Sequence, residues 1–254
     1  MEGNWQWAAY GKHPVVKDYF KVGQYGSLVK AFSTWVDSGY QRIDAKRKSS
    51  PCSWRFWARG LKRDGLGCGV VRDSHDQLAR PYPLLIMGAG QLAGWEDQWD
   101  LIPLACERTW AQMEYLYTKT LDSLKQLEEE IQKIPPPLSE WAELREARRN
   151  SPEGSPSSNP LSPSPGKWKE EEQLPRLQPK TELFLPLDPG LFPDPASGIR
   201  YLHDLFKRGE KKIPQAIFMG GTLEKTLLAV FKRSVAPADF VQLWSVSSSE
   251  EHQS

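Results

Sequence analysis

The chain has little net charge, few cysteines and no long apolar run, and each of these shortages excludes a class of protein. Its 254 residues carry a formal net charge of +1, so no overall field attracts nucleic acid or an anionic membrane surface. No window reaches the roughly 18 consecutive apolar residues of a membrane span. We therefore expect a protein that binds no nucleic acid and does not insert into a membrane.

The cysteines and histidines also lack the spacing of known sites. Cys52, Cys68 and Cys106 are odd in number and form no C-x-x-C pair, which argues against a disulfide framework. The four histidines are scattered along the chain without the spacing of zinc ligands. The start of the chain, Trp5-Gln6-Trp7-Ala8, has neither the basic region nor the apolar region of a signal peptide. We expect a cytoplasmic protein without a metal or a cofactor.

Apolar residues are nevertheless numerous enough for an ordinary core, at 39% of the chain. The composition changes abruptly after Ile134, and residues 151–180 alternate serine, proline and charge. Such a stretch buries too little apolar surface to offset its conformational entropy, so it is expected to be disordered. The predicted organisation is 1–134 and 181–244 as two parts of one domain, 135–180 as a Pro/Ser-rich disordered linker inserted in it, and 245–254 as a tail.

Periodicity predicts strands and helices on both sides of that linker. Alternating or continuous apolar patterns predict strands at 7–11, 53–58, 66–72, 83–87 and 215–219, with Arg63-Asp64-Gly65 as a hairpin turn. Helical spacing predicts helices at 29–40, at 97–127 (one long or two broken helices), at 198–207 and at 223–231, the last capped by Thr222. Together they predict an α/β or α+β fold, in which helices cover a mixed sheet.

Two short motifs hint at chemistry, and in both cases an ordinary structural role is favoured. Ser74-His75-Asp76 has the residue types of a hydrolase triad, but adjacent side chains point in alternating directions and cannot form its chain of contacts. Gly220-Gly221-Thr222 before a predicted helix resembles a phosphate-binding turn. However, the Walker pattern is incomplete there. We predict no catalytic residue, and a turn and helix cap at the glycines.

Arg80 lies between Leu78-Ala79 and Pro81-Tyr82-Pro83, just before a predicted apolar strand, with Asp73 and Asp76 a few positions earlier. A guanidinium that pairs bidentately with a carboxylate would fix this loop. We favour this structural role for Arg80 over a surface contact that a partner uses. Asp18 has the same two interpretations, a local cap or an exposed charge. Trp5, Trp7, Trp54 and Trp57 are expected mostly in the core, with one or two exposed for binding, because tryptophan is enriched in binding hot spots.

Two stretches, Gly11–Phe20 and Gly67–Ile86, resemble the TagF (ImpM) family of type VI secretion proteins. Members typically read Gly-Lys-x-Pro-x-x-x-Asp-Phe, then Trp-x-Phe, a Gly-Val strand, Ser-x-Asp and Gly-Arg-x-x-Pro-Leu. The residues that carry this resemblance, and hence the candidate partner-binding residues, are Lys12, Pro14, Asp18, Phe20, Trp54, Phe56, Ser74, Asp76, Arg80 and Pro83.

The chain departs from the family pattern at two places. Tyr19 stands between Asp18 and Phe20, and Ala79 replaces the glycine before Arg80. If the backbone at Ala79 is left-handed, alanine is strained there by about 1 kcal/mol, because only glycine adopts that conformation without cost.

The resemblance implies a non-enzymatic, cytoplasmic regulator that represses assembly of the type VI secretion system after translation. It also implies a partner, the forkhead-associated scaffold protein of that system. Two alternatives remain open at this point. One is a small nucleotide- or phosphate-binding protein that uses Gly220-Gly221-Thr222, and the other is a structural subunit of the secretion apparatus.

Overall fold

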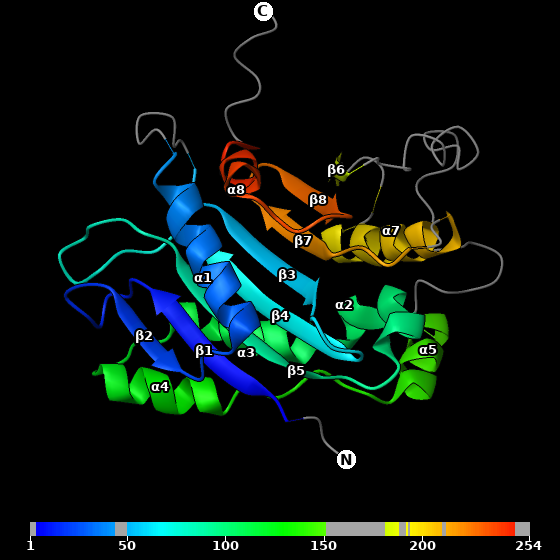
Figure 1. The fold of residues 1–254 in the computed structure, drawn as a ribbon, viewed down its shortest axis with the longest axis horizontal. Coiled ribbons are helices and arrows are strands. Elements are labelled where there is room, and N and C mark those ends of the chain that lie inside the picture. The colour runs from blue at the N-terminus through cyan, green and yellow to red at the C-terminus, as the bar shows by residue number, and fades with distance from the viewer. Residues whose placement is uncertain are drawn as a thin grey trace, which may run out of the picture.

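An eight-stranded antiparallel sheet forms the centre of the fold (Figure 1). The computed structural model describes residues 4–43, 50–150, 181–187, 192, 194–209 and 212–246. The strands lie in the order β2-β1-β5-β4-β3-β7-β8-β6, and every pairing among them is antiparallel. Their bounds are β1 Gln6–Gly11, β2 Phe20–Gly23, β3 Ser53–Arg59, β4 Gly65–Arg72, β5 Leu84–Gln91, β6 Glu182–Pro186, β7 Ala216–Gly221 and β8 Thr226–Phe231. Because β7 pairs with β3, the parts before and after residue 180 share one sheet.

Helices cover both faces of this sheet, which confirms the predicted fold class. The sheet is antiparallel throughout, however, and not mixed as predicted. The helical segments are α1 Ser27–Tyr40, the 3₁₀ helix η2 Trp95–Leu101, α2 Ile102–Ala105, α3 Glu107–Thr118, α4 Leu124–Gln132, α5 Trp141–Asn150, α7 Pro195–Gly209 and α8 Pro237–Trp244. Helices α1 and α8 cover one face, and η2, α3, α4 and α7 cover the other.

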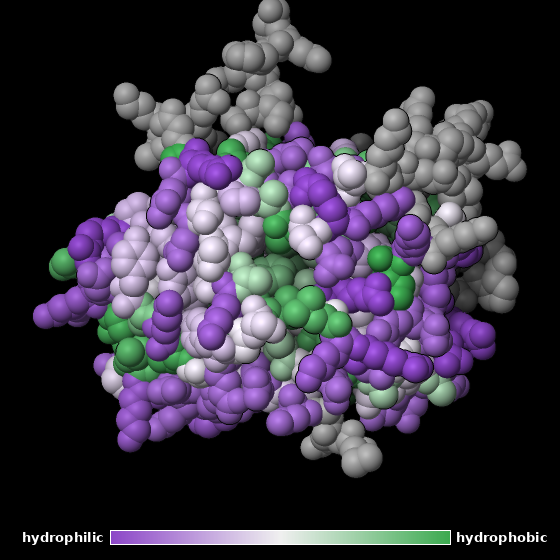
Figure 2. Space-filling view, viewed as in Figure 1, coloured by the Kyte–Doolittle hydropathy of each residue, from purple (hydrophilic) through white to green (hydrophobic). Residues whose placement is uncertain are grey.

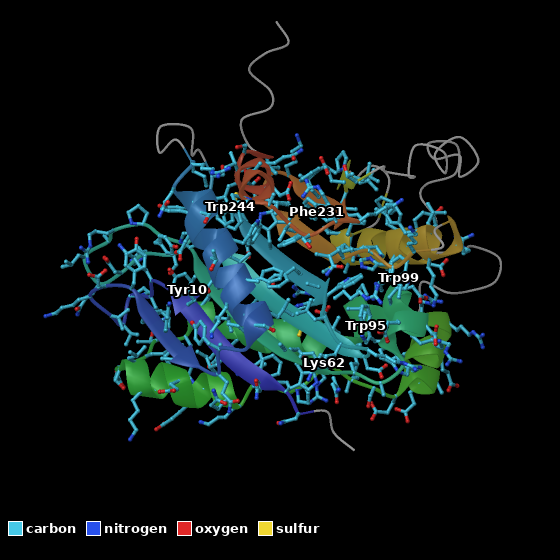
Figure 3. The ribbon with its side chains drawn as sticks, in the orientation of Figure 1. Tyr10, Lys62, Trp95, Trp99, Phe231 and Trp244 are labelled. Atoms are coloured by element: carbon cyan, nitrogen blue, oxygen red, sulfur yellow. The ribbon has the colours of Figure 1, made fainter. Side chains whose placement is uncertain are left out.

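Alternation along β3 explains how one strand serves both cores. Trp54 and Phe56 point toward α1, where Phe56 stacks on Phe32 with 4.7 Å between ring centroids. Trp57 points to the opposite face and meets Trp95 edge-on at 5.6 Å. Trp95 and Trp99 lie toward the end of the sheet that is far from Tyr10 (Figure 3). The buried tryptophans of β3 therefore have structural roles.

The face that carries α1 has an apolar hollow at its centre (Figure 2). Its volume is about 220 Å³, and Leu28 and Phe32 of α1, with Ala58 of β3 and Val235, line it. The hollow lies beside helix α1, whose buried apolar residues are Val29, Phe32, Trp35 and Val36.

Most of the predicted elements are present. Strands β1, β3, β4, β5 and β7 and helices α1 and α7 occupy the expected segments. Asp64 has a φ of 57° in the predicted β3–β4 turn. The segment 97–127 is divided among η2, α2, α3 and the start of α4, because Pro103 begins a new helical turn.

One predicted helix is wrong. Residues 226–231 form strand β8, which pairs with β7 and β6, and not a helix capped by Thr222. Leu228 and Val230 belong to one core while Leu227, Ala229 and Phe231 belong to the other. A short apolar run that is buried on both faces has no helical or strand periodicity of its own, so only its pairing partners decide between the two.

Part of the expected linker is also ordered. Within 135–150, α5 packs Leu144 against Leu101 and Ala105. Arg148 of this helix forms an ion pair of 2.7 Å with Asp100, whose side chain is 5% exposed. The prediction of disorder over 151–180 lies outside the described residues, as does the tail from residue 247 onward.

Candidate partner-binding site

Two loops that carry the family motifs lie side by side at one end of the sheet, to the left in Figure 1. Residues 12–19 follow β1, and residues 73–83 join β4 to β5. Because Gly11 and Arg72 both pair with Leu84 at the start of β5, the register brings the two loops together. We refer to these segments, 12–19 and 73–83, as the motif loops.

Asp76 holds the motif loops together from inside. Its side chain is fully buried, and its Oδ2 lies 2.7 Å from Arg80 Nε and 3.0 Å from Lys12 Nζ. Its Oδ1 accepts hydrogen bonds from the backbone N–H groups of Leu78 (2.9 Å) and Arg80 (3.0 Å). Burial acts to raise the pKa of this carboxyl, but these hydrogen bonds outweigh burial and hold the pKa well below its usual range. The ionised carboxylate thus fixes both loops.

Arg80 pairs with Asp76 as predicted, although not bidentately. One edge of its guanidinium contacts Asp76, while Nη2 donates to the carbonyl of Lys17 and lies 3.8 Å from Asp18. The Arg80 side chain is 49% exposed, so the same residue both joins the loops and reaches the surface. Asp73 has another role, since it accepts hydrogen bonds from the backbone N–H of Cys52 and from the Trp244 indole.

The candidate residues divide between this site and the core. Lys12, Asp18, Asp76 and Arg80 meet in the motif loops, where Pro14 is exposed and Ser74 is half-buried. Phe20, Trp54, Phe56 and Pro83 are buried, and Trp54 and Phe56 lie in the core beneath α1. Trp5, half-buried, is the most exposed of the four tryptophans considered for binding.

A tyrosine cluster beside the motif loops escaped the sequence analysis. Tyr10 and Tyr82 both donate to the Asp37 carboxylate of α1. The rings of Tyr19 and Tyr40 meet Tyr82 edge-on at 4.6 and 4.8 Å. The sequence could not reveal this cluster, because its members come from segments that are distant along the chain. Only Tyr82, between Pro81 and Pro83, lies within a motif that the sequence analysis considered.

Two large side chains beside this cluster are more than half exposed, although the Tyr19 ring also packs on Tyr82. Leu78 is 63% exposed and Tyr19 is 53% exposed, and each comes from a different motif loop. Lys17, Asp18 and Arg80 of the same two loops are also exposed. Exposed apolar residues on a rigid base with a charged rim are typical of protein interfaces.

Comparison with known proteins identifies the family. A family model described as the TagF N-terminal domain, type VI secretion system-associated, matches residues 8–134. The chain belongs to the TagF family. The matched region contains both motif loops, strands β2 to β5 and all but the first two residues of β1.

A crystal structure of PA0076 from Pseudomonas aeruginosa PAO1 shares 22% sequence identity with this TagF chain, with a TM-score of 0.37. The match covers 52% of this chain and 64% of that one, which is less than two thirds of that protein's length. No curated protein matches the chain.

The hydrolase-like triplet of this TagF chain does not converge. The Asp76 carboxylate is bonded to Lys12 and Arg80, whereas His75 is exposed and its Nδ1 lies 2.9 Å from the Asp76 carbonyl. Gly220 and Gly221 form the end of β7 with φ of 149° and 142°, so they do not open a helix. Within the described ranges, no group of three His, Cys, Asp or Glu side chains could hold a metal ion. None of the helices in those ranges is both long and apolar enough to cross a bilayer.

Ala79 adopts the left-handed conformation that the family's glycine would favour, with a φ of 58°. Replacing Ala79 by glycine should therefore stabilise the chain by about 0.5–1 kcal/mol, because relief of strain exceeds the entropic cost of glycine. Urea unfolding would measure this change. As a control, Ala31→Gly at an exposed site within α1 should destabilise by about 1 kcal/mol, and destabilisation by both variants would contradict the strain at Ala79.

Proposed function

We propose that this TagF chain is a non-enzymatic regulator that represses type VI secretion assembly by binding a protein partner through its motif loops. The observation that carries this proposal is that the motif loops are held together by buried contacts while they expose large apolar side chains. Buried Asp76 ties the two loops together, while Leu78 and Tyr19 remain outside. A loop that is ordered before binding loses little conformational entropy when it binds.

The family resemblance indicates the forkhead-associated scaffold protein of the secretion system as the partner. Occupation of that scaffold by TagF would block a site that assembly needs, and no substrate would be turned over. The cytoplasm is the compartment in which this repression would occur. The Asp76 carboxylate supports a binding role over a hydrolytic one, because its contacts are with Lys12 and Arg80 and not with His75.

Leu78→Asp tests this surface. The substitution should weaken binding of the purified scaffold at least tenfold in calorimetry, because it places an unpaired charge at the centre of the interface. The free energy of unfolding should change by no more than about 0.5 kcal/mol, since the side chain is exposed.

Leu61→Asp is the matched control. Leu61 is 92% exposed and precedes Lys62 in the β3–β4 hairpin, at the end of the sheet far from Tyr10 (Figure 3). It should bind the scaffold as the wild type does. Equal binding by Leu78→Asp and the wild type would exclude the motif loops as the surface, and no binding by the wild type would exclude the scaffold as the partner.

A further inference from the structure

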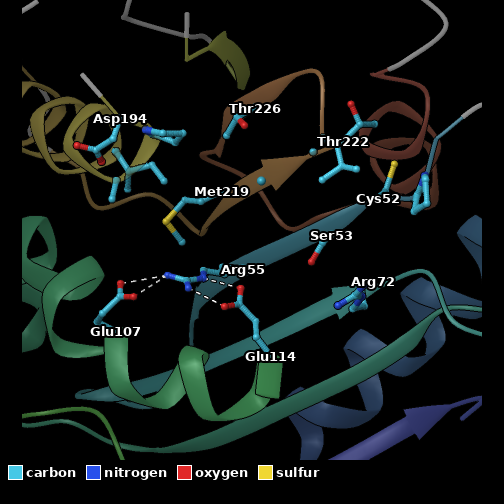
Figure 4. Close-up of a pocket in the computed structure, with 17 residues that line it drawn as sticks. Cys52, Ser53, Arg55, Arg72, Glu107, Glu114, Asp194, Met219, Thr222 and Thr226 are labelled. Carbon is cyan, nitrogen blue, oxygen red and sulfur yellow. Dashed lines mark hydrogen bonds and ion pairs between the residues drawn. The ribbon is translucent and has the colours of Figure 1, made fainter. Parts of the chain in front are cut away.

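A second site lies on the face of the sheet opposite α1, in a cleft between α3 and the start of α7 (Figure 4). The cavity has a volume of about 590 Å³, within the range of small-molecule sites. Its floor is the ends of four neighbouring strands, and Glu107 and Glu114 of α3 form one wall. Asp194 and Ile199 lie on the opposite wall.

The floor is a row of cross-strand partners. Arg72 of β4 pairs with Ser53 of β3, Ser53 with Gly221 of β7, and Gly221 with Thr226 of β8. Partners in register share one face of a sheet, so their side chains point into the same cleft. Gly221 has no side chain in the middle of this row. At its φ of 142° a Cβ would lie 2.2 Å from the Lys225 carbonyl oxygen, so the backbone of the β7–β8 hairpin excludes any side chain there.

The carboxylates that line the cleft are already engaged. Glu114 makes two hydrogen bonds of 2.7 Å to Arg55, and both oxygens of Glu107 contact Arg55 Nη1 at 3.1 and 3.0 Å (Figure 4). Asp194 accepts from the backbone N–H and the hydroxyl of Ser197, at 2.9 and 2.6 Å. It therefore caps α7, and its charge is matched to the positive end of that helix.

Three hydrogen-bond donors on the floor of the cleft, Arg72, Ser53 and Thr226, remain available to a ligand. The Arg72 guanidinium lies 5.1 Å from the centroid of the Tyr117 ring, and the Tyr117 hydroxyl lies 2.9 and 2.8 Å from the carbonyl oxygens of Val70 and Leu84, which share its one donor hydrogen. Among the described residues, Arg72 has no carboxylate partner, and the hydroxyls of Ser53 and Thr226 have no hydrogen-bond partner. A guanidinium that lies over the face of a ring can still donate its N–H groups to an oxyanion.

We propose that this cleft binds a small organic phosphate, with its phosphate group on Arg72 and Ser53. Three phosphate oxygens suit the guanidinium fork and the neighbouring hydroxyl better than the two oxygens of a carboxylate. The organic part extends over Gly221 toward Thr226 and packs on the apolar side chain of Met219. The site shares no residue with the motif loops and does not depend on the function proposed for them.

Phenyl phosphate is a suitable probe for calorimetry and for ¹⁵N NMR titration of the full chain at low ionic strength. We expect saturable binding with shifts at Ser53, Arg72, Gly221 and Thr226. Arg72→Gln should weaken it at least tenfold. Arg63→Gln, an exposed arginine in the β3–β4 turn, is the matched control and should bind as the wild type does.

Three results would overturn the proposal: no saturable binding at millimolar phenyl phosphate, equal affinity in Arg72→Gln and the wild type, or equal binding of benzoate. If Arg72→Gln fails to fold, Ser53→Ala takes its place and should lower the affinity several-fold. Unchanged affinity in that variant would also contradict the site.

Discussion

Asp76→Ala is expected to lower the midpoint of thermal unfolding by about 10 °C and to abolish the scaffold binding that we propose for the motif loops. The carboxylate is fully buried and neutralises Lys12, whose side chain is 6% exposed. Its removal leaves that ammonium buried without a counter-charge, and it leaves the N–H groups of Leu78 and Arg80 without their acceptor. Loss of one partner of a buried pair is far more damaging than loss of an exposed one.

Two further variants separate the causes of that loss. Lys12→Met combined with Asp76→Ala removes both buried charges and should recover part of the stability, since no ion remains uncompensated. Arg80→Ala removes only the half-exposed partner of Asp76, so it should lower the midpoint by less than Asp76→Ala does. Calorimetric unfolding of the four proteins measures these differences. A midpoint for Asp76→Ala equal to that of the wild type would show that Asp76 does not hold the motif loops together.

The pairing of Arg80 with Asp76 was predictable because both residues lie in one short loop. The contribution of Lys12 was not, because it depends on β1 and β4 flanking β5 in a particular register. The same limit applies to the tyrosine cluster. Asp37 lies on α1 and Tyr10 on β1, and nothing in either segment indicates the other.

The apolar pattern also failed to predict the secondary structure of β8, because a strand that is buried on both faces has no polar–apolar alternation. Strand β8 has an apolar run that fits a helix as well as a strand, and its identity depends on β6 and β7 on its two sides. The cleft has the same origin, since Arg72, Ser53, Gly221 and Thr226 become a row only through three strand pairings. Residues before and after position 180 contribute to it, and no single stretch of sequence marks the site.

His203 is expected to make the stability of the fold fall in mild acid. The residue is fully buried in α7, its Nε2 accepts from the Trp57 indole at 3.2 Å, and its Nδ1 lies 2.8 Å from the Ile199 carbonyl. This arrangement requires a neutral ring that carries its proton on Nδ1. Burial lowers the pKa of His203 from 6.5 to about 4, against the smaller opposing effects of the Ile199 carbonyl and Asp100.

Because the pKa of His203 is lower in the folded chain than in the unfolded chain, the unfolded chain takes up a proton first as the pH falls. The contribution is therefore complete above pH 6.5, decreases as the pH falls toward 4, and amounts to roughly 2–3 kcal/mol between pH 7.5 and 4.5. The control is His203→Gln, whose amide can replace both hydrogen bonds but does not titrate. Urea unfolding of both proteins across this range should give a steeper loss of stability for the wild type by about that amount. Parallel curves would contradict the prediction, because they would show that His203 has the same pKa in the folded and unfolded chains.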